Sequence, residues 1–317
     1  MQPIYLDDAT ICGLLDYPRV VAILNESFAD LAVGQAEIHA RQRTDSRNLR
    51  LSTMGALWNA RQVGGVKVYP TVGGQFSFSI TLFDLENNRP IAVLDGAEIT
   101  KFRTAGLTAL IASRSATQQV KKLALFGAGF QGRAQVQALC AFFRFDEISV
   151  VDPLVDDAWC SHLAWQTGSV VKRCSPEAAT VDADIVVTAT RSQEPVFNGN
   201  WLKPGAFVSA IGISAPTGRE LDDATLSRAS RIIVEWKPQS LREAGELVLW
   251  QTDNALEREK IVDLPELYRQ SEPWRGSEAD IIVAKSVGVG LSDVACAYLA
   301  FTCSQHVQET QAQGVAA

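Results

Sequence analysis

Three glycines follow a run of apolar residues and precede a segment that can form a helix. The run ends at Phe126, and Gly127, Gly129 and Gly132 come next in a GxGxxG spacing. In this context the first glycine allows a tight turn, the second lets the backbone approach a pyrophosphate, and the third lets the helix pack closely on the strand. N–H groups at the start of a helix attract the phosphates. The spacing predicts a dinucleotide site, with Gln131 as a further cofactor-binding residue; a purely structural glycine turn is the alternative.

An acidic residue stands where a dinucleotide fold binds the adenosine ribose. Asp152 comes twenty residues after Gly132, at the end of the next apolar run. Asp156 and Asp157 follow, and no Arg or Lys comes close behind to hold a 2′-phosphate. Asp152 therefore favours NAD as the cofactor and makes NADP a weaker prediction. The alternative is an aspartate that only starts the turn before Pro153.

The glycine loop belongs to a series of short apolar runs that are typical of buried strands. They are rich in Val and Ile and alternate little, as strands covered on both faces do, and the segments between them can be helical. The runs comprise residues 122–126, 147–151, 169–172, 184–188, 206–211 and 231–235. This alternation predicts an α/β fold with a doubly wound parallel sheet of the Rossmann type.

The segments before and after this series have a different texture. Residues 20–31 carry apolar side chains near helical spacing. Residues 49–94 contain short alternating runs separated by glycine and asparagine turns, which predicts an antiparallel sheet. The tail offers a strand at 281–287 and a long helix at 292–308, and we expect it to rejoin the first part of the chain. A second, α+β domain is therefore expected beside the parallel sheet.

Composition excludes several classes of function. The 317 residues are 47% hydrophobic and 21% charged, with a net charge of −7 and no cluster of Lys or Arg, so nucleic acid is not an expected partner. No run of about 18 apolar residues indicates a membrane span, and the start of the chain lacks the features of a secretory signal. The six cysteines form no CxxC and the three histidines no ligand pair, so we expect a cytoplasmic protein without a metal.

Seven further strings occur in an order that resembles the ornithine cyclodeaminase and mu-crystallin family. They are GVK at 65–67, LDGAEIT at 94–100, RTA at 103–105, TAT at 188–190, KPGA at 203–206, RELD at 219–222 and KSVG at 285–288. The resemblance covers the chain from about residue 43 to residue 293, which is more specific than a glycine loop alone. It implies a homodimer. It also implies a substrate-binding and dimerisation domain of residues 1–112 plus 288–317, into which a dinucleotide-binding domain of residues 113–287 is inserted.

The resemblance also implies a reaction and a set of site residues. Members of the family transfer hydride at the α-carbon of an amino acid or its imine, so we expect an NAD(P)-dependent oxidoreductase that acts on a small amino or imino acid. The family's carboxylate clamp falls on Arg43, Lys67 and Arg103, although other arginines flank Arg43. Hydroxyls of Thr104 and Thr190 are expected to contact the cofactor; ordinary turn hydroxyls are the alternative.

The chemistry independently requires such a clamp. An α-imino acid must present its α-carbon to a nicotinamide, and a bidentate Arg with a point-charge Lys fixes its carboxylate. Neighbouring cations and burial should lower the pKa of Lys67, so that its amine can donate and accept a proton near neutral pH. Lys67 is therefore the first catalytic candidate, and a solvated surface cation is the alternative.

One position separates the subclasses of the family. Where members that cyclise ornithine carry an aspartate, this chain has Ser214. A hydroxyl cannot act as a carboxylate base or pair as strongly with an ammonium, so a ketimine reductase or amino-acid dehydrogenase is favoured. An ammonia-releasing lyase that recycles NAD and a non-catalytic crystallin-like binding protein are the alternatives. Asp293 is interpreted as a helix cap, and a place near the site is the alternative.

Overall fold

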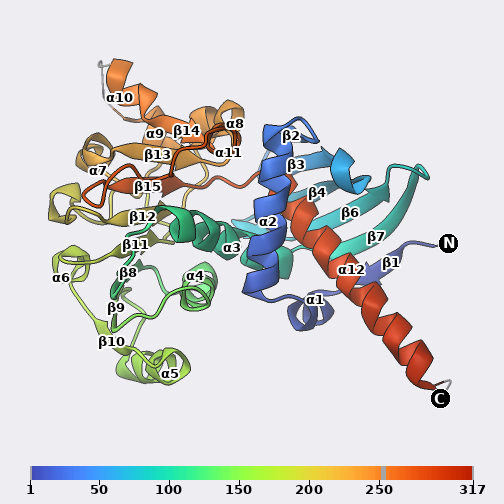
Figure 1. Ribbon diagram of the computed structural model, residues 1–317, viewed down its shortest axis with the longest axis horizontal. Coiled ribbons are helices and arrows are strands. Elements are labelled where there is room, and N and C mark those ends of the chain that lie inside the picture. Colours follow the sequence, from blue (N-terminus) through green and yellow to red (C-terminus); the bar gives the residue numbers. More distant parts are fainter. Residues whose placement is uncertain (1, 251–254, 316–317) are drawn as a thin grey trace. The chain divides into compact units, whose positions relative to one another are not determined.

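The computed structural model describes residues 2–250 and 255–315 (Figure 1). Within that range the chain forms two compact units, one from residues up to 103 together with those from 289 on, and one from residues 104–288. The first boundary lies inside one helix, α3 (Ala97–Ser115), as does residue 112, where the sequence places the division. Each unit has its own sheet.

The sheet of the first unit confirms the antiparallel sheet predicted for residues 49–94. Its strand order is β1-β7-β6-β4-β3-β2, with β5 on β4, and only the β1–β7 pair is parallel. An edge strand, β2, was not predicted, because its outer half is charged and polar rather than apolar. The strands are β1 (Ile4–Leu6), β2 (Ala36–Ser46), β3 (Leu49–Trp58), β4 (Val63–Val72), β5 (Gln75–Phe76), β6 (Ser79–Asp84) and β7 (Arg89–Asp95).

Two helices far apart in the sequence pack with this sheet and with each other, α2 (Tyr17–Ala32) and α12 (Gly290–Val315) (Figure 1). Asp16 caps α2 by accepting a hydrogen bond from Arg19 N, and the apolar face predicted for residues 20–31 is buried. The long tail helix is confirmed and starts two residues earlier than expected. The remaining short elements are α1 (Asp8–Leu14) and the 3-10 turn η1 (Asn59–Arg61).

The second unit confirms the doubly wound parallel sheet. Its order is β10-β9-β8-β11-β12-β15-β13-β14, and every pair is parallel. The first five strands thus lie in the order 3-2-1-4-5 that dinucleotide-binding folds use. The strands are β8 (Lys122–Phe126), β9 (Glu147–Val151), β10 (Val170–Arg173), β11 (Ile185–Thr188), β12 (Phe207–Ala210), β13 (Arg231–Val234), β14 (Ile261–Asp263) and β15 (Ile282–Lys285).

The end of this sheet differs from the prediction. The strand predicted at 281–287 is β15, which lies in this sheet between β12 and β13, ahead of its place in the chain order, and α12 is the part of the tail that belongs to the first unit. A further strand, β14, is three residues long, too short to stand out as an apolar run. The helices of this unit are α4 (Phe130–Cys140), α5 (Asp157–Thr167), α6 (Pro176–Thr180), α7 (Asp223–Arg228), α8 (Lys237–Glu243), α9 (Gly245–Val248), α10 (Ala255–Glu259) and α11 (Leu264–Arg269), with the turn η2 (Gly199–Trp201).

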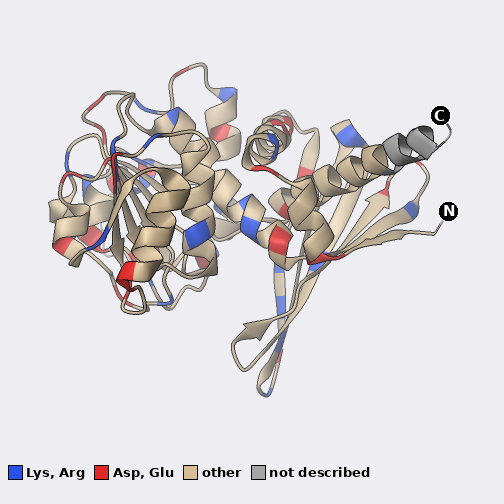
Figure 2. Cartoon of the chain, turned by 90° about the horizontal axis from the view of Figure 1, so that it is seen from below, with Lys and Arg blue, Asp and Glu red and all other residues tan. Residues whose placement is uncertain are grey.

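Charge and sulfur chemistry are unremarkable over the described chain. Lys and Arg are interspersed with Asp and Glu in both units (Figure 2). All six cysteines are free thiols. In residues 2–250 and 255–315 we find no group of His, Cys, Asp and Glu side chains that could hold a metal ion. Every helix of that range is too short or too polar to cross a membrane.

Candidate active site

A buried lysine lies at the centre of the first unit. Lys67, on β4, is only 2% exposed. Its Nζ donates a hydrogen bond of 2.9 Å to Asp293 Oδ1 and one of 2.5 Å to Thr100 Oγ1. Thr100 lies on α3 and Asp293 in the first turn of α12. A strand and two helices thus meet around one ammonium group.

Glycines allow α12 to lie close to β3 and β4. A Cβ on Gly290, at the start of α12, would lie 2.2 Å from the carbonyl oxygen of Gly55, and a Cβ on Gly55 would lie 2.3 Å from that of Gly65. No side chain fits such distances. The missing Cβ atoms therefore let the first turn of α12 lie directly on β3 and β4, which brings Asp293 to Lys67.

A second cation completes the cluster. Arg103 is buried, and its Nε lies 3.4 Å from Asp293 Oδ1. Neither Arg103 Nε nor Asp293 Oδ2 has a hydrogen-bond partner among the described residues. Buried polar atoms are rarely left in that state, so each one needs a reason. Polar groups of a bound substrate would supply the missing partners.

The environment shifts two pKa values in ways that suit proton transfer. Burial has the largest effect on Lys67; the Asp293 carboxylate opposes it and the Arg103 guanidinium adds to it, and the pKa falls from 10.5 to about 8. Burial would raise the pKa of Asp293, but the two cations outweigh it and hold that pKa below its usual value. A lysine that titrates near neutral pH therefore faces an ionised carboxylate.

Asp293 corrects the sequence interpretation. The interpretation as a helix cap is wrong, and the alternative, a place near Lys67, agrees with the structure: its Oδ1 accepts from Lys67 and its Oδ2 accepts no hydrogen bond from the described backbone. In the sequence alone, its position four residues after Val289 looks like that of a helix cap. Its partner lies 226 residues earlier in the chain, where no local pattern reveals it.

Two arginines of β2, Arg41 and the predicted Arg43, act on different charged groups. A bulge interrupts the pairing of β2 with β3 between His39 and Gln42, and Arg41 lies in it. The charge of Arg41 contributes to the pKa values of Lys67 and Asp293. The charge of Arg43, the predicted clamp residue, lowers the pKa of Asp45. Spacing along a sequence cannot show a bulge, so it could not distinguish the two arginines.

Aromatic rings border the ammonium group. Lys67 Nζ lies 4.3 Å from the ring centre of Phe78 and 5.9 Å from that of Tyr69. Phe76 stacks on Phe78 with centroids 5.7 Å apart. One side of the cluster is therefore an apolar wall, while the other carries the cations.

In the second unit, each glycine of the loop has the geometry that a pyrophosphate requires. Gly127 has a φ of +87° and Gly132 would place a Cβ 1.9 Å from Gly127 O, whereas a Cβ on Gly129 would meet no atom within 4 Å. Gly129 caps α4 without a side-chain bond. Gln131 Oε1, in the first turn, is buried and has no partner among the described residues. The loop therefore fits the phosphates of a dinucleotide.

Asp152 directly follows β9 and lies against this loop. Its Oδ2 accepts from Ala128 N at 2.7 Å and its Oδ1 from Leu154 N at 2.8 Å. A cation is close as well: Arg133 Nε donates to Ala128 O at 3.3 Å, and its guanidinium lies over the ring of Trp159.

The remaining predicted residues also belong to the second unit. Thr104 is buried on α3. The Thr190 hydroxyl donates to Glu220 Oε1 at 2.7 Å and accepts from Ser192 N at 3.1 Å. These bonds stabilise the loop after β11, to which Thr190 belongs. Ser214 is exposed on the loop after β12. Of the predicted site residues, Lys67 and Arg103 lie together in the first unit and Asp152 lies against the glycine loop in the second.

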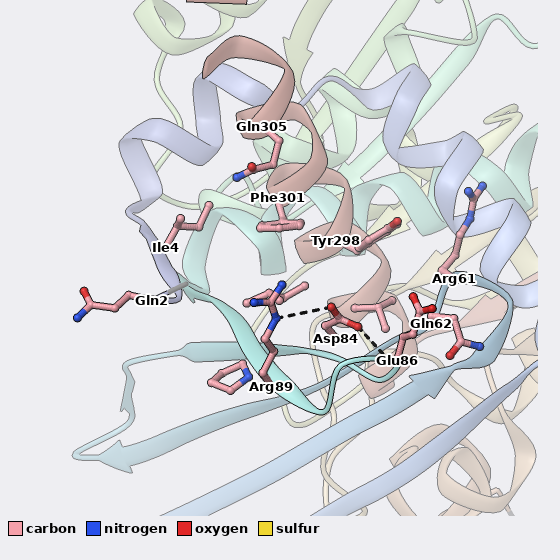
Figure 3. A pocket seen from close by; sticks show the side chains of 13 residues that line it. Gln2, Ile4, Arg61, Gln62, Asp84, Glu86, Arg89, Tyr298, Phe301 and Gln305 are labelled. Atoms are coloured by element: carbon pink, nitrogen blue, oxygen red, sulfur yellow. Dashed lines mark hydrogen bonds and ion pairs between the residues drawn. The ribbon is translucent and has the colours of Figure 1, made fainter. Parts of the chain in front are cut away.

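A separate cavity of about 310 Å³ lies in the first unit (Figure 3). Tyr298 and Phe301 of α12 form one wall, and Asp84 and Arg89 lie across from it. None of the thirteen lining residues belongs to the Lys67 cluster. This cavity is therefore distinct from the candidate site.

Known proteins resemble this chain over nearly its full length. A model of the ornithine cyclodeaminase/mu-crystallin family matches residues 8–304. A Δ1-pyrroline-2-carboxylate reductase of Colwellia psychrerythraea is 26% identical over 301 residues, which are 90% of this chain and 94% of that protein. The ketimine reductase mu-crystallin of Mus musculus is 30% identical over 224 residues, 70% of this chain and 68% of that protein. The crystal structure of a probable ornithine cyclodeaminase from Bordetella pertussis Tohama I is 39% identical, with a TM-score of 0.93 and coverage of 97% of this chain and 99% of that one.

Proposed function

The chain belongs to the ornithine cyclodeaminase/mu-crystallin family, and on that premise we propose that it is an NAD(P)-dependent reductase of the imines of α-amino acids. The observation that carries the proposal is the buried cluster of Lys67, Asp293 and Arg103. It combines a carboxylate-binding cation with an amine whose pKa is about 8. The relatives described as reductases of pyrroline carboxylate and of ketimines support this substrate class.

The second unit holds the coenzyme in this proposal. Gly127, Gly129 and Gly132 leave room for the pyrophosphate, and Asp152 lies where it can accept hydrogen bonds from the adenosine ribose. When bound, the nicotinamide supplies the hydride. Everything else in the reaction falls to side chains of the chain itself.

The first unit binds and protonates the substrate. Arg103 and Arg41 bind the carboxylate of the imino acid, because guanidinium groups match its geometry. Reduction of C=N adds hydride to the α-carbon and a proton to nitrogen, and Lys67 Nζ donates that proton. Its hydrogen bonds to Asp293 and Thr100 leave the third N–H of the ammonium for the substrate. Asp293 keeps the ammonium form available by opposing the effect of burial.

Ser214 argues against loss of ammonia by ring closure. A lyase of the ornithine cyclodeaminase type needs a carboxylate to handle the side-chain amine, and a serine hydroxyl neither carries the charge nor acts as that base. The name of the Bordetella protein favours the lyase as the second candidate. The two functions differ in a simple product test: the lyase releases ammonia from L-ornithine with no net change in NADH, whereas the reductase consumes one NADH per imine.

We also propose NAD as the preferred coenzyme. Asp152 is followed by Asp156 and Asp157, whose charges oppose a 2′-phosphate. Arg133 is the residue that would bind this phosphate if the preference were reversed. The comparison of kcat/KM for NADH and NADPH decides the point. The Asp152→Ala variant should weaken NADH binding by about tenfold, the effect of a lost hydrogen bond to a charged group.

The proposal includes a cytoplasmic homodimer, with substrate binding and dimerisation in the first unit and coenzyme binding in the second. Free thiols agree with a reducing compartment. Apolar side chains are exposed on β3, β4 and β5 of the first unit: Leu49, Leu51, Leu57, Val72 and Phe76. Exposed patches of this kind mark interaction surfaces. Light scattering should give twice the chain mass for the native protein and a smaller mass for Leu51→Lys.

An absorbance screen tests the function directly. Pyrroline and piperideine carboxylates are offered with NADH, and L-amino acids with NAD. The reductase should oxidise NADH with at least one cyclic imine. Coenzyme binding without turnover of any imine or amino acid would instead support a non-catalytic binding protein.

A further inference from the structure

A fully buried glutamate in the second unit accepts four hydrogen bonds. Glu220 Oε1 accepts from Thr190 N and Thr190 Oγ1, both at 2.7 Å. Its Oε2 accepts from Gly212 N at 2.8 Å and from Thr188 Oγ1 at 2.9 Å. The side chain has no exposed surface. A buried carboxylate costs free energy unless it is well bonded, so these four donors must be held in place together.

The four donors come from two neighbouring strands of the sheet. Thr188 ends β11 and Thr190 follows it, while Gly212 follows β12, and these strands pair with each other. The two loops also touch: a Cβ on Gly212 would lie 2.2 Å from Thr190 O and 2.5 Å from Glu220 Oε1. Glu220 therefore clamps the ends of β11 and β12 together.

Two further buried charged residues, Glu246 and Lys285, bond to Glu220 and to the loop after β12. Glu246 Oε1 accepts from Glu220 N at 3.0 Å, and Glu246 Oε2 pairs with Lys285 Nζ at 2.9 Å. The same Nζ donates to Ile213 O at 2.6 Å. The loop that begins at Gly212 is thus held on one side by Glu220 and on the other by Lys285.

The segment that is bonded to Glu220 also lies close to the glycine loop. A Cβ on Gly127 would lie 2.6 Å from Ala189 O and 3.1 Å from Thr190 Cγ2, so the turn at Gly127 packs against the segment that Glu220 holds. In folds with this strand order, the strands on the β8–β10 side carry the adenosine half of a dinucleotide, and the ends of β11 and β12 border the other half.

We propose that Glu220 is a positioning residue for the nicotinamide half of the coenzyme: it fixes the loops after β11 and β12 in the shape that binds the nicotinamide and its ribose. The inference rests on the nicotinamide coenzyme of the proposed function. Glu220 touches neither half itself, because it is buried behind both loops.

Glu220→Gln tests this role with little change in volume. An amide offers one acceptor oxygen and an NH2 donor, so a backbone N–H, of Thr190 or of Gly212, loses its acceptor. Affinity for NADH is compared with affinity for ADP-ribose, which lacks the nicotinamide. We expect the Kd for NADH to rise about tenfold, the effect of one lost hydrogen bond to a charged group, while the Kd for ADP-ribose stays within twofold of the native value.

Asp184→Asn is the matched control. Asp184 is also buried and also accepts from two backbone N–H groups, of Lys121 and Lys122, and from Lys203, but it lies at the amino end of β11. The same chemical change at the opposite edge of the sheet should leave both Kd values unaltered. Should Glu220→Gln fail to fold, Thr188→Val removes one donor to the same carboxylate and should raise the Kd for NADH selectively, by a few-fold.

The outcomes separate this proposal from the proposed function. If both Kd values stay as in the native protein, or if both rise by the same factor, Glu220 does not have this role. If the native protein binds NADH but reduces no imine, the function fails while the ratio still decides the role of Glu220.

Discussion

Lys67 Nζ donates a hydrogen bond of 2.9 Å to the carboxylate of Asp293 across 226 residues of sequence, and both side chains are buried. Neither charge could remain buried alone, because an unpaired ion inside a protein costs several kcal/mol or shifts its pKa until it is neutral. Burial lowers the pKa of Lys67 and the Asp293 carboxylate opposes this, so the pKa is about 8, low enough for the proton to leave and high enough for it to be present at neutral pH.

Imine reduction should depend on the ammonium form of Lys67. Since its pKa lies at about 8, kcat/KM for NADH-dependent reduction should be constant below that pH and fall tenfold per pH unit above it. The reverse oxidation needs the free amine and should rise with pH to a plateau above the same value. Profiles between pH 6 and 10 in both directions check this. Parallel profiles, both rising or both falling, would contradict the assignment.

Asp293→Asn should shift the pH above which kcat/KM for imine reduction falls. The carboxylate raises the pKa of Lys67, so its removal leaves burial and Arg103 to lower the value further. The falling limb of reduction should therefore lie below pH 8, and activity at pH 7.5 should drop more than activity at pH 6. A limb that stays in place would show that Asp293 does not set the pKa of Lys67. Thermal unfolding of the variant shows whether the fold survives.

Lys67→Ala should remove the proton donor and leave the coenzyme site intact. General acid catalysis contributes about 10²–10⁴-fold, so we expect kcat to fall by about a thousandfold. The Kd for NADH, measured by fluorescence, should not change, since Lys67 belongs to the other unit. Lys121→Ala, at an exposed lysine, is the control. Near-native turnover of Lys67→Ala would remove this residue from the mechanism.

Arg41 and Arg43 can be separated by their effect on KM. Arg41 acts on the charges of Lys67 and Asp293, whereas Arg43 acts on Asp45. Arg41→Met should raise KM for the imino acid by about 10–100-fold, the usual effect of a lost charged hydrogen bond. Arg43→Met should change it by less than threefold. A larger rise in KM for Arg43→Met than for Arg41→Met would show that Arg43 binds the carboxylate of the imino acid.

Local patterns predicted the dinucleotide fold well because its signals are local. The apolar runs at 122–126 and 147–151 coincide with β8 and β9, and the turn at Gly127 has the positive φ that only glycine adopts easily. Short strands such as β14 gave no such signal. The polar outer half of β2 hid that strand, since alternation of apolar residues is what marks a sheet.

The site was harder to predict than the fold. Lys67 and Arg103 were found through a resemblance, and the structure brings them together. The sequence did not decide between a cap and a site role for Asp293 because its partner is distant in the chain, and Arg41 did not stand out because a bulge interrupts the pairing of β2 with β3. Glu220 stood in a recognised string without a role, since four hydrogen bonds to two loops appear only in three dimensions.

Transfer of isotope from the coenzyme to the product tests the central claim most directly. The native protein is given a cyclic imine of an α-amino acid and NADH that carries deuterium at the transferable position, and the product is analysed by mass spectrometry and NMR. The account predicts one deuterium on the α-carbon for each NADH consumed, and no ammonia. NADH that stays unconsumed with every imine offered, or a product without deuterium at that carbon, would contradict it.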